Sequence, residues 1–148
     1  MRAAGFNRFS VGLQSFNDDE LKMLGRVHTS ADFLRTWENL RACGVQNINV
    51  DLIAGLPGQT LEKFLHSLEK LVTLAPEHIS VYGLQIEEGT PFFARGIVCD
   101  QLLMRKMLEE TRTRLKNAGY HHYEISNFAL PGFESKHNLN YWRYGEYV

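Results

Sequence analysis

The stretch that most constrains the fold runs from Asn47 to Thr60, where a short apolar run leads directly into a turn. Its valine, leucine and isoleucine residues are typical of a buried strand, and the glycines and proline of residues 55–58 end that strand. Thr60 is suited to cap the helix that follows. One carboxylate, Asp51, lies inside the strand. Because a buried charge is costly unless it is paired or hydrogen-bonded, we expect Asp51 either to have an internal partner or to face a cavity that holds a ligand.

Strand-like and helix-like segments alternate along the chain. Alternating or apolar runs predict four strands, at residues 8–16, 47–54, 78–86 and 120–128. One-sided apolar stripes predict helices that begin at four residues of the capping type: Asn17, Ser30, Thr60 and Asp100. Glu20, three residues after Asn17, indicates a capping box. Residues 129–148 have no clean period and are predicted to form an aromatic-rich loop.

The alternation of strands and helices predicts an α/β fold, with a mainly parallel sheet and helical crossovers. Each of the first three strands has one small or polar face, made by Ser10/Gly12/Gln14, Asn49/Asp51 and Gly83/Gln85. Such faces suit strands that line a (β/α) barrel near its functional end, so Gln14, Asp51 and Gln85 are expected to point into one shared space. Closing a small barrel takes about eight strands. Either the sheet is open or strands are missing from this chain.

Composition limits the possible partners. A formal net charge of -1 gives no electrostatic argument for binding nucleic acid or an anionic membrane. No run is apolar enough to span a bilayer and no signal peptide is visible, so a cytoplasmic location is expected. The two cysteines, Cys43 and Cys99, form no metal-binding motif and are interpreted as packed or half-exposed thiols.

Five blocks of the sequence together resemble one family, in the same order along the chain: RFSVGLQSF, LGRVH, VDLIAGLPGQT, HISVYGLQIEEGTPFF and YEISNFALPGFESKHNLNYW. The family is that of the radical S-adenosylmethionine (SAM) proteins similar to oxygen-independent coproporphyrinogen III oxidase, and the resemblance is strongest to its heme chaperone (HemW) branch. It implies part of a radical SAM partial (β/α) TIM-like barrel. Family members are considerably longer, and the thiolates of their N-terminal CxxxCxxC motif hold a [4Fe-4S] cluster on which SAM is cleaved to a 5′-deoxyadenosyl radical.

This chain has no CxxxCxxC motif. The resemblance therefore implies a fragment, in which residues 1–128 are the C-terminal half of the barrel and residues 129–148 lead toward an absent C-terminal region. Matched motif by motif, four residues would contact SAM: Gln14, Arg26, Asp51 and Gln85. Asp51 can accept from a hydroxyl or amine, Arg26 can bind a carboxylate with two hydrogen bonds, and the glutamines can both donate and accept. Without the resemblance, Arg26 would be interpreted as a solvated charge and Gln14 as part of an amide network.

The HNLNYW run is similar to the HNxxYW motif of the heme chaperone branch, which has been linked with heme binding. It contributes His137, Asn138, Tyr141 and Trp142. Histidine is a common axial ligand of heme iron, so His137 is a possible iron ligand, and aromatic rings can stack on the macrocycle. Taken alone, His137 would be interpreted as a surface histidine and the aromatic residues as a packing patch.

The resemblance implies a protein that binds heme and delivers it to hemoproteins. Two alternatives stay open. One is an enzyme of the coproporphyrinogen oxidase type, and the other is a cluster-free module that stands alone and binds a porphyrin or nothing. Whether the parent protein is an enzyme is left undecided by the sequence, and this chain without the cluster motif is expected to be inactive.

Overall fold

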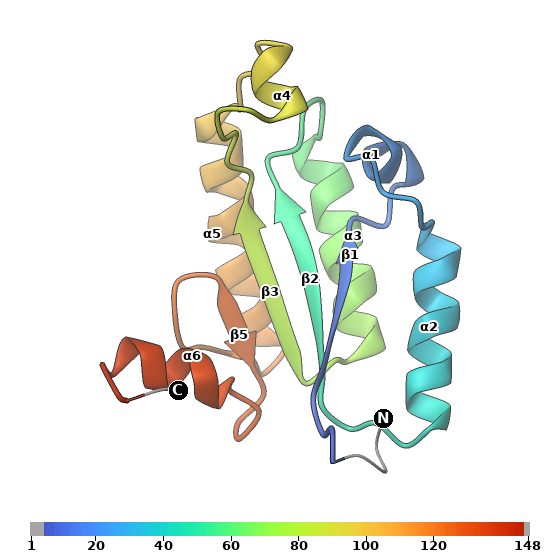
Figure 1. Cartoon of the computed structure of the whole chain (residues 1–148), viewed down its shortest axis with the longest axis vertical. Coiled ribbons are helices and arrows are strands. Elements are labelled where there is room, and N and C mark those ends of the chain that lie inside the picture. The colour runs from blue at the N-terminus through green and yellow to red at the C-terminus, as the bar shows by residue number, and fades with distance from the viewer. Residues whose placement is uncertain (1–4, 147–148) are drawn as a thin grey trace.

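The computed structural model describes residues 5–146 and contains one five-stranded sheet with strand order β1-β2-β3-β5-β4 (Figure 1). Strands β1 (Phe9–Gln14), β2 (Ile48–Ala54) and β3 (His78–Gly83) run parallel. The expected α/β fold with a mainly parallel sheet is confirmed. The fourth predicted strand forms two short pieces instead of one, β4 (His121–His122) and β5 (Asn127–Ala129), and both pairings of β5 are antiparallel.

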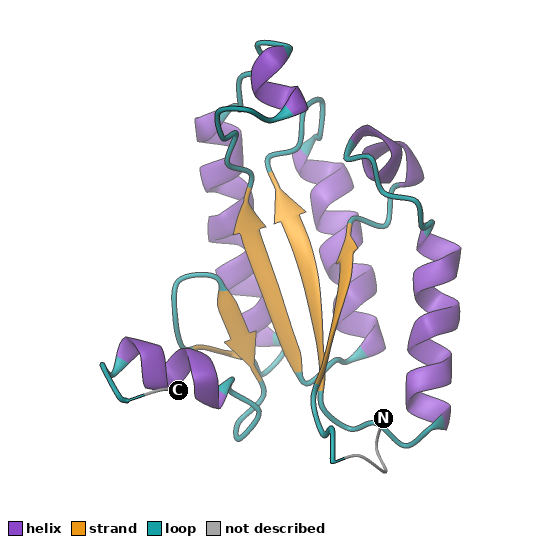
Figure 2. Ribbon diagram, in the orientation of Figure 1, coloured by secondary structure: helices purple, strands orange, loops and turns teal. Residues whose placement is uncertain are grey.

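Helices cover one face of this sheet and leave the other open (Figure 2). α3 (Leu61–Leu74) and α5 (Gln101–Asn117) pack behind the strands, and α2 (Ser30–Ala42) lies beside β1. The short helices α1 (Asp18–Met23) and α4 (Pro91–Ala94) lie at the carboxyl ends of the parallel strands, and α6 (Lys136–Trp142) lies near β5. Within residues 5–146, no helix is both long and apolar enough to cross a membrane.

The hydrophobic core lies between the sheet and the helices α3 and α5. Alternate residues of β2 turn toward it, because successive side chains of a strand point to opposite faces. They pack against apolar side chains that recur at helical spacing on α3 and α5. The residues of both sets are almost fully buried: Ile48, Val50 and Leu52 of β2, Phe64, Leu68 and Leu71 of α3, and Met107 and Leu115 of α5. Fully burying each such side chain contributes about 1.5–3 kcal/mol, so this layer holds the sheet in place.

The helix starts test the predicted caps. Asn17, Thr60 and Asp100 each accept a backbone N–H of the first turn, as expected. The prediction for Ser30 is wrong by one residue. Thr29 is the cap, and Asp32 completes a capping box with it. Both threonine and serine can cap, but only Thr29 has an acidic residue three positions later.

The loop prediction for residues 129–148 is also wrong in the part that the structure describes, and residues 147 and 148 lie outside it. Ala129 belongs to β5, and α6 begins after Ser135, whose hydroxyl accepts from the backbone N–H of Asn138. No residue of α6 is buried. A helix that buries no side chain shows no apolar stripe, so the period that reveals the other helices is absent here.

Candidate functional site

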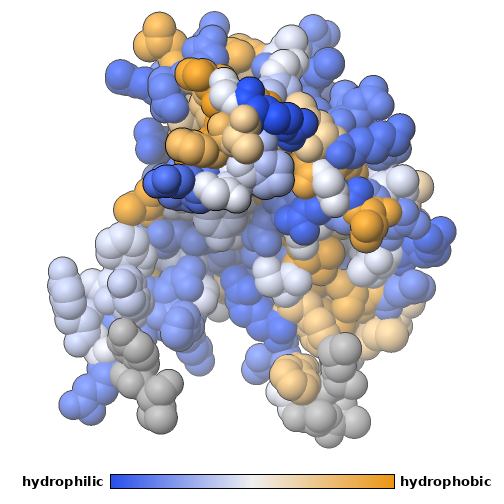
Figure 3. Space-filling model, turned by 45° about the horizontal axis from the view of Figure 1, so that its top comes forward, coloured by the Kyte–Doolittle hydropathy of each residue, from blue (hydrophilic) through white to orange (hydrophobic). Residues whose placement is uncertain are grey.

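Side chains from three strands form a polar surface on the open face of the sheet. The core-facing residues of β2 turn toward the helices, so Asn49 and Asp51 turn the other way. Strand register aligns two rows across this face: Ser10, Asn49 and His78 in one, and Gly12, Asp51 and Ser80 in the next. Figure 3 shows hydrophilic residues gathered in the hollowed front of the molecule. The polar faces predicted for the first two strands therefore do share one surface. The prediction for the third strand is wrong, because β3 contributes His78 and Ser80 to this surface, whereas Gly83 faces Met104 of α5 on the other side.

The side-chain amide of Asn49 joins the two rows. Its Nδ2 donates to Ser10 Oγ at 2.8 Å and to Asp51 Oδ1 at 2.7 Å. Its Oδ1 accepts from Ser80 Oγ at 3.0 Å and lies 2.6 Å from His78 Nδ1. Because an amide oxygen can only accept, His78 Nδ1 is the donor of the last bond. Asn49 thus uses both of its donor hydrogens and accepts two hydrogen bonds.

His78 extends this network toward the C-terminal part of the chain. With its proton on Nδ1, the imidazole accepts at Nε2, which lies 2.7 Å from Tyr123 Oη. The Tyr123 hydroxyl in turn accepts from the backbone N–H of Ser135, the residue that caps α6. Burial and, to a lesser degree, the charge of Arg8 lower the pKa of His78 from 6.5 to about 3. The ring is therefore neutral near pH 7 and holds a fixed tautomer.

Asp51 has an internal partner, which was one of the two expected alternatives. That partner, Asn49, occupies only Oδ1. Among residues 5–146, none makes a hydrogen bond to the second oxygen, Oδ2, and the side chain is only half-buried. The carboxylate therefore keeps acceptor capacity toward the open face, where a ligand hydroxyl or amine can donate to it.

The end of β1 brings Gln14 close to Asp51. The register with β2 shifts after Gly12, and Gln14 has a φ of 71°, which residues other than glycine rarely adopt. Its amide folds back over Gly12, where an added Cβ would lie 2.7 Å from Gln14 Nε2. Gly12 is paired with Asp51, and paired strands lie about 5 Å apart. The Gln14 amide and the Asp51 carboxylate therefore border the same small space, and its shape depends on a glycine at position 12.

The other two predicted SAM contacts lie toward the carboxyl ends of the strands. Arg26 is exposed in the connection between α1 and α2. Gln85 is exposed after β3 and lines a cavity of about 380 Å³ between the end of α1 and α4. Gly25, the neighbour of Arg26, lines the same cavity. The four residues thus form two groups, one on the sheet face and one near its rim.

α6 presents the HNLNYW run on an exposed helix. His137 and Tyr141 are four residues apart and share one side of the helix, and both are exposed. The rings of Tyr141 and Trp142 meet edge to face with centroids 6.2 Å apart. Asn138 is half-buried, and a hydrogen bond from its side chain helps to lower the pKa of Tyr123 against the larger effect of burial. The motif therefore has one side toward Tyr123 and one toward solvent.

Sequence reasoning missed a buried network at the carboxyl ends of β1 and β2. Glu20 does not close the expected capping box at Asn17. Its carboxylate is 5% exposed and accepts from Ser15 Oγ at 2.5 Å and from Gln59 Nε2 at 3.0 Å. Gln59 Oε1 accepts from the backbone N–H groups of Gly55 and Leu56 and so fixes the turn after β2. The spacing of Asn17 and Glu20 is that of a capping box, and only tertiary packing shows that the carboxylate turns inward.

Metal-binding capacity is limited in this chain. Residues 5–146 contain no group of three or more His, Cys, Asp or Glu side chains placed to hold a metal ion. The whole sequence contains two cysteines, fewer than the three thiolates of the CxxxCxxC motif. The residues of this chain therefore do not fit a [4Fe-4S] cluster.

Comparison with known proteins shows what this chain is similar to. Residues 1–71 match the model of the radical SAM superfamily. The chain is 44% identical to the mouse protein named "Radical S-adenosyl methionine domain-containing protein 1, mitochondrial", over 99% of this chain and 34% of that protein. It is also 44% identical to the heme chaperone HemW of Haemophilus influenzae, over 99% of this chain and 38% of that protein. The chain thus spans little more than a third of the length of these relatives.

Among solved structures, the chain is similar to coproporphyrinogen III oxidase (HemN) from Escherichia coli, which is described as a radical SAM enzyme. The TM-score is 0.78 at 28% identity, over 96% of this chain and 33% of that one. The likeness confirms the predicted fold, part of a radical SAM (β/α) barrel with parallel strands and helical crossovers. The predicted boundary between residues 128 and 129 falls inside β5, and the division into two segments stays a prediction.

Proposed function

We propose that the open face of the sheet contributes to SAM binding and that α6 contributes to heme binding, in a protein that acts as a heme chaperone. The match of residues 1–71 to the radical SAM superfamily supports this proposal. The observation that carries the proposal is 44% identity over 99% of the chain to a protein named for that role. The exposed helix that holds the HNLNYW run, next to the polar sheet face, supports it.

In this proposal SAM lies toward the carboxyl ends of the strands. Asp51 Oδ2 accepts from a ligand hydroxyl or amine, and the Gln14 amide, held over Gly12, bonds a neighbouring polar group. Arg26 donates two hydrogen bonds from its guanidinium to the ligand carboxylate. Gln85 hydrogen-bonds the ligand from the rim of the sheet, at the carboxyl end of β3. The [4Fe-4S] cluster that the family implies must have its ligands outside this chain.

Heme is proposed to lie against the exposed side of α6. His137 supplies an imidazole for the iron, and Tyr141 and Trp142 supply rings that can stack on the macrocycle. Asn138 faces Tyr123 and holds the helix to the sheet network. A hemoprotein acceptor and a cytoplasmic location belong to the same proposal.

Two titrations of the purified chain test it. Hemin added to the wild type is expected to give a saturable change in the heme absorbance band, which the His137→Ala variant loses. His66→Ala, which removes an exposed histidine of α3, is the matched control and keeps the band. Equilibrium dialysis with SAM is expected to show binding that Asp51→Asn weakens. A wild type that binds neither hemin nor SAM, or a His137→Ala variant that binds hemin as tightly as the wild type, contradicts the proposal.

The likeness to coproporphyrinogen III oxidase favours one alternative, an oxidase that decarboxylates porphyrinogen propionates. Anaerobic incubation with coproporphyrinogen separates the two functions, with the protein isolated from its natural host so that any cluster is retained. Conversion to a decarboxylated product supports the oxidase. Retention of heme without conversion supports the chaperone. A stand-alone porphyrin-binding module instead predicts that the 148-residue chain binds heme and shows no SAM binding.

A further inference from the structure

Arg8 places a positive charge on the open face of the sheet, and no carboxylate within residues 5–146 forms an ion pair with it. Its Nε is shielded from solvent and has no hydrogen-bond partner among the same residues. In the part of the chain that the structure describes, the ion pairs within 4.0 Å all join other residues. A half-buried guanidinium is stabilised only where its donors and its charge are compensated, so this position is an incomplete site.

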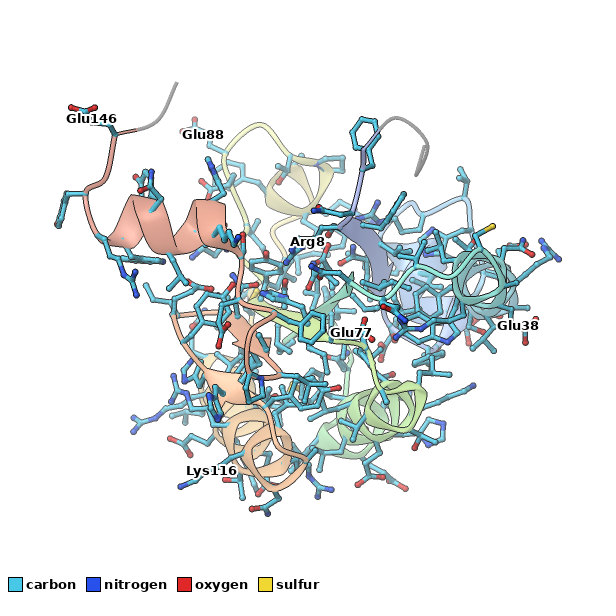
Figure 4. The ribbon with its side chains drawn as sticks, turned by 90° about the horizontal axis from the view of Figure 1, so that it is seen from below. Arg8, Glu38, Glu77, Glu88, Lys116 and Glu146 are labelled. Carbon is cyan, nitrogen blue, oxygen red and sulfur yellow. The ribbon has the colours of Figure 1, made fainter. Side chains whose placement is uncertain are left out.

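The surroundings of Arg8 locate that charge between the sheet and α6. Its positive charge lowers the pKa of both His78 and Tyr123, so the guanidinium lies near both side chains. Figure 4, which views the molecule from below, shows Arg8 on the side of the sheet where α6 lies, away from α3 and α5. Tyr123 in turn holds Ser135 at the start of α6. Arg8 therefore lies next to the base of the helix that carries the HNLNYW run.

The two side chains that feel the charge of the guanidinium, His78 and Tyr123, are themselves neutral. His78 is uncharged because burial depresses its pKa, and burial raises the pKa of Tyr123 so that its hydroxyl stays protonated. On the same sheet face, Asp51 lies four residues beyond Asn47, the residue just before β2 that is level with Arg8. Four residues span about 13 Å along a strand. Asp51 therefore cannot form an ion pair with Arg8.

Within the chain, the side chain of Asn47 is the candidate hydrogen-bond partner of Arg8. Asn47 Oδ1 is also buried and without a hydrogen-bond partner, and Asn47 is level with Arg8 in the strand register. A small rotation could join Arg8 Nε to this oxygen. That bond would satisfy one donor of the five on a guanidinium and would leave its charge uncompensated. The charge of Arg8 would still be balanced only by an anion.

We propose that Arg8 binds a carboxylate of the ligand held against α6, and that this carboxylate is a heme propionate. The inference rests on the proposed function and deepens it, because it assigns the residue that receives the acidic edge of the porphyrin. SAM also carries a carboxylate, but the residues proposed to bind SAM lie far along the strands. Gln14 is six residues beyond Arg8, about 20 Å away along β1, whereas the charge of Arg8 acts on Tyr123, which bonds the residue that caps α6.

The test compares hemin with its dimethyl ester, in which both propionates are uncharged. Arg8→Gln is expected to weaken hemin binding by about 10-fold or more, since it removes a charge-assisted hydrogen bond, and to leave ester binding unchanged. Arg8→Lys keeps the positive charge but cannot donate two parallel hydrogen bonds to a carboxylate, so a smaller loss of hemin affinity than for Arg8→Gln is expected. Arg112→Gln, which removes an exposed arginine of α5 behind the sheet, is the matched control. Thermal melts of each variant confirm folding.

The outcomes separate this inference from the function it rests on. If the wild type binds hemin through His137 and Arg8→Gln binds it equally well, the propionate assignment is wrong and heme binding stands. If Arg8→Gln weakens hemin and ester alike, Arg8 has a structural role instead. If Arg8→Gln weakens SAM and not hemin, the carboxylate belongs to SAM and the assignment is again wrong. If the wild type binds no hemin, the proposed function itself fails.

Discussion

Replacement of Asn49 by alanine tests the network on which the open face depends. Asn49 is 4% exposed, and its amide bonds Ser10, Asp51, His78 and Ser80. Water can reach the first two partners, but His78 and Ser80 are each 1% exposed and would lose their partner in a dry site. Each buried unsatisfied group costs about 1–3 kcal/mol, so Asn49→Ala is expected to lower the unfolding free energy by about 2–5 kcal/mol.

Urea unfolding followed by circular dichroism measures this loss. For a chain of this size, 1 kcal/mol corresponds to about 2–4 °C in Tm, so the variant should melt roughly 4–20 °C below the wild type. Ser10→Ala is the matched control. It removes one hydrogen bond at an exposed position and should cost about 1 kcal/mol or less. If Asn49→Ala is no more destabilised than Ser10→Ala, Asn49 does not organise the face and the network argument is refuted.

Three further predictions concern stability. His78 has a native pKa of about 3 against an ordinary 6.5, so the unfolded chain binds more protons between these pH values. The unfolding free energy should therefore fall as the pH falls from 6.5 to 3, and His78 should contribute at most about 1.4 kcal/mol per pH unit to this fall. His78→Gln should remove that contribution. If the wild type and the variant lose stability equally with pH, the buried ring is not held neutral. Thr29→Ala should cost about 1 kcal/mol in urea unfolding and Ser30→Ala less, and the reverse order would restore Ser30 as the cap. Tyr120→Phe should cost about 1 kcal/mol, because the hydroxyl donates to Pro76 O at 2.6 Å in the buried core; an unchanged midpoint would show that this bond adds nothing.

The parts of the fold that were predicted from sequence are those with local signals. Apolar periods and capping residues locate α3 and α5 and the three parallel strands, because those elements bury one face against the core. α6 buries no residue and so gave no period. The exchange of Ser30 for Thr29 as a cap is a local error, since neighbouring hydroxyl residues compete for the same role.

The site was predictable only in part. The alternation of polar and apolar residues placed Asn49 and Asp51 on one face, but the partner His78 lies 29 residues later. That contact depends on the register of β2 against β3, which the sequence does not state. Gln14 was expected to point into a shared space, yet its position over Gly12 follows from a backbone turn with positive φ that no pattern revealed. Likewise, the unpaired charge of Arg8 appears only when neighbouring strands are assembled.

The central claim is that ligands bind on the open face of the sheet beside α6. It is tested most directly by titrating the ¹⁵N-labelled chain with gallium protoporphyrin IX, a diamagnetic analogue of heme, and recording backbone amide shifts. The amides of Ser135 to Trp142 are expected to shift together with those of Arg8 and Tyr123, while the amides on the outer surfaces of α3 and α5 stay unchanged. Shifts confined to those outer surfaces, or no saturable shift at all, would contradict it.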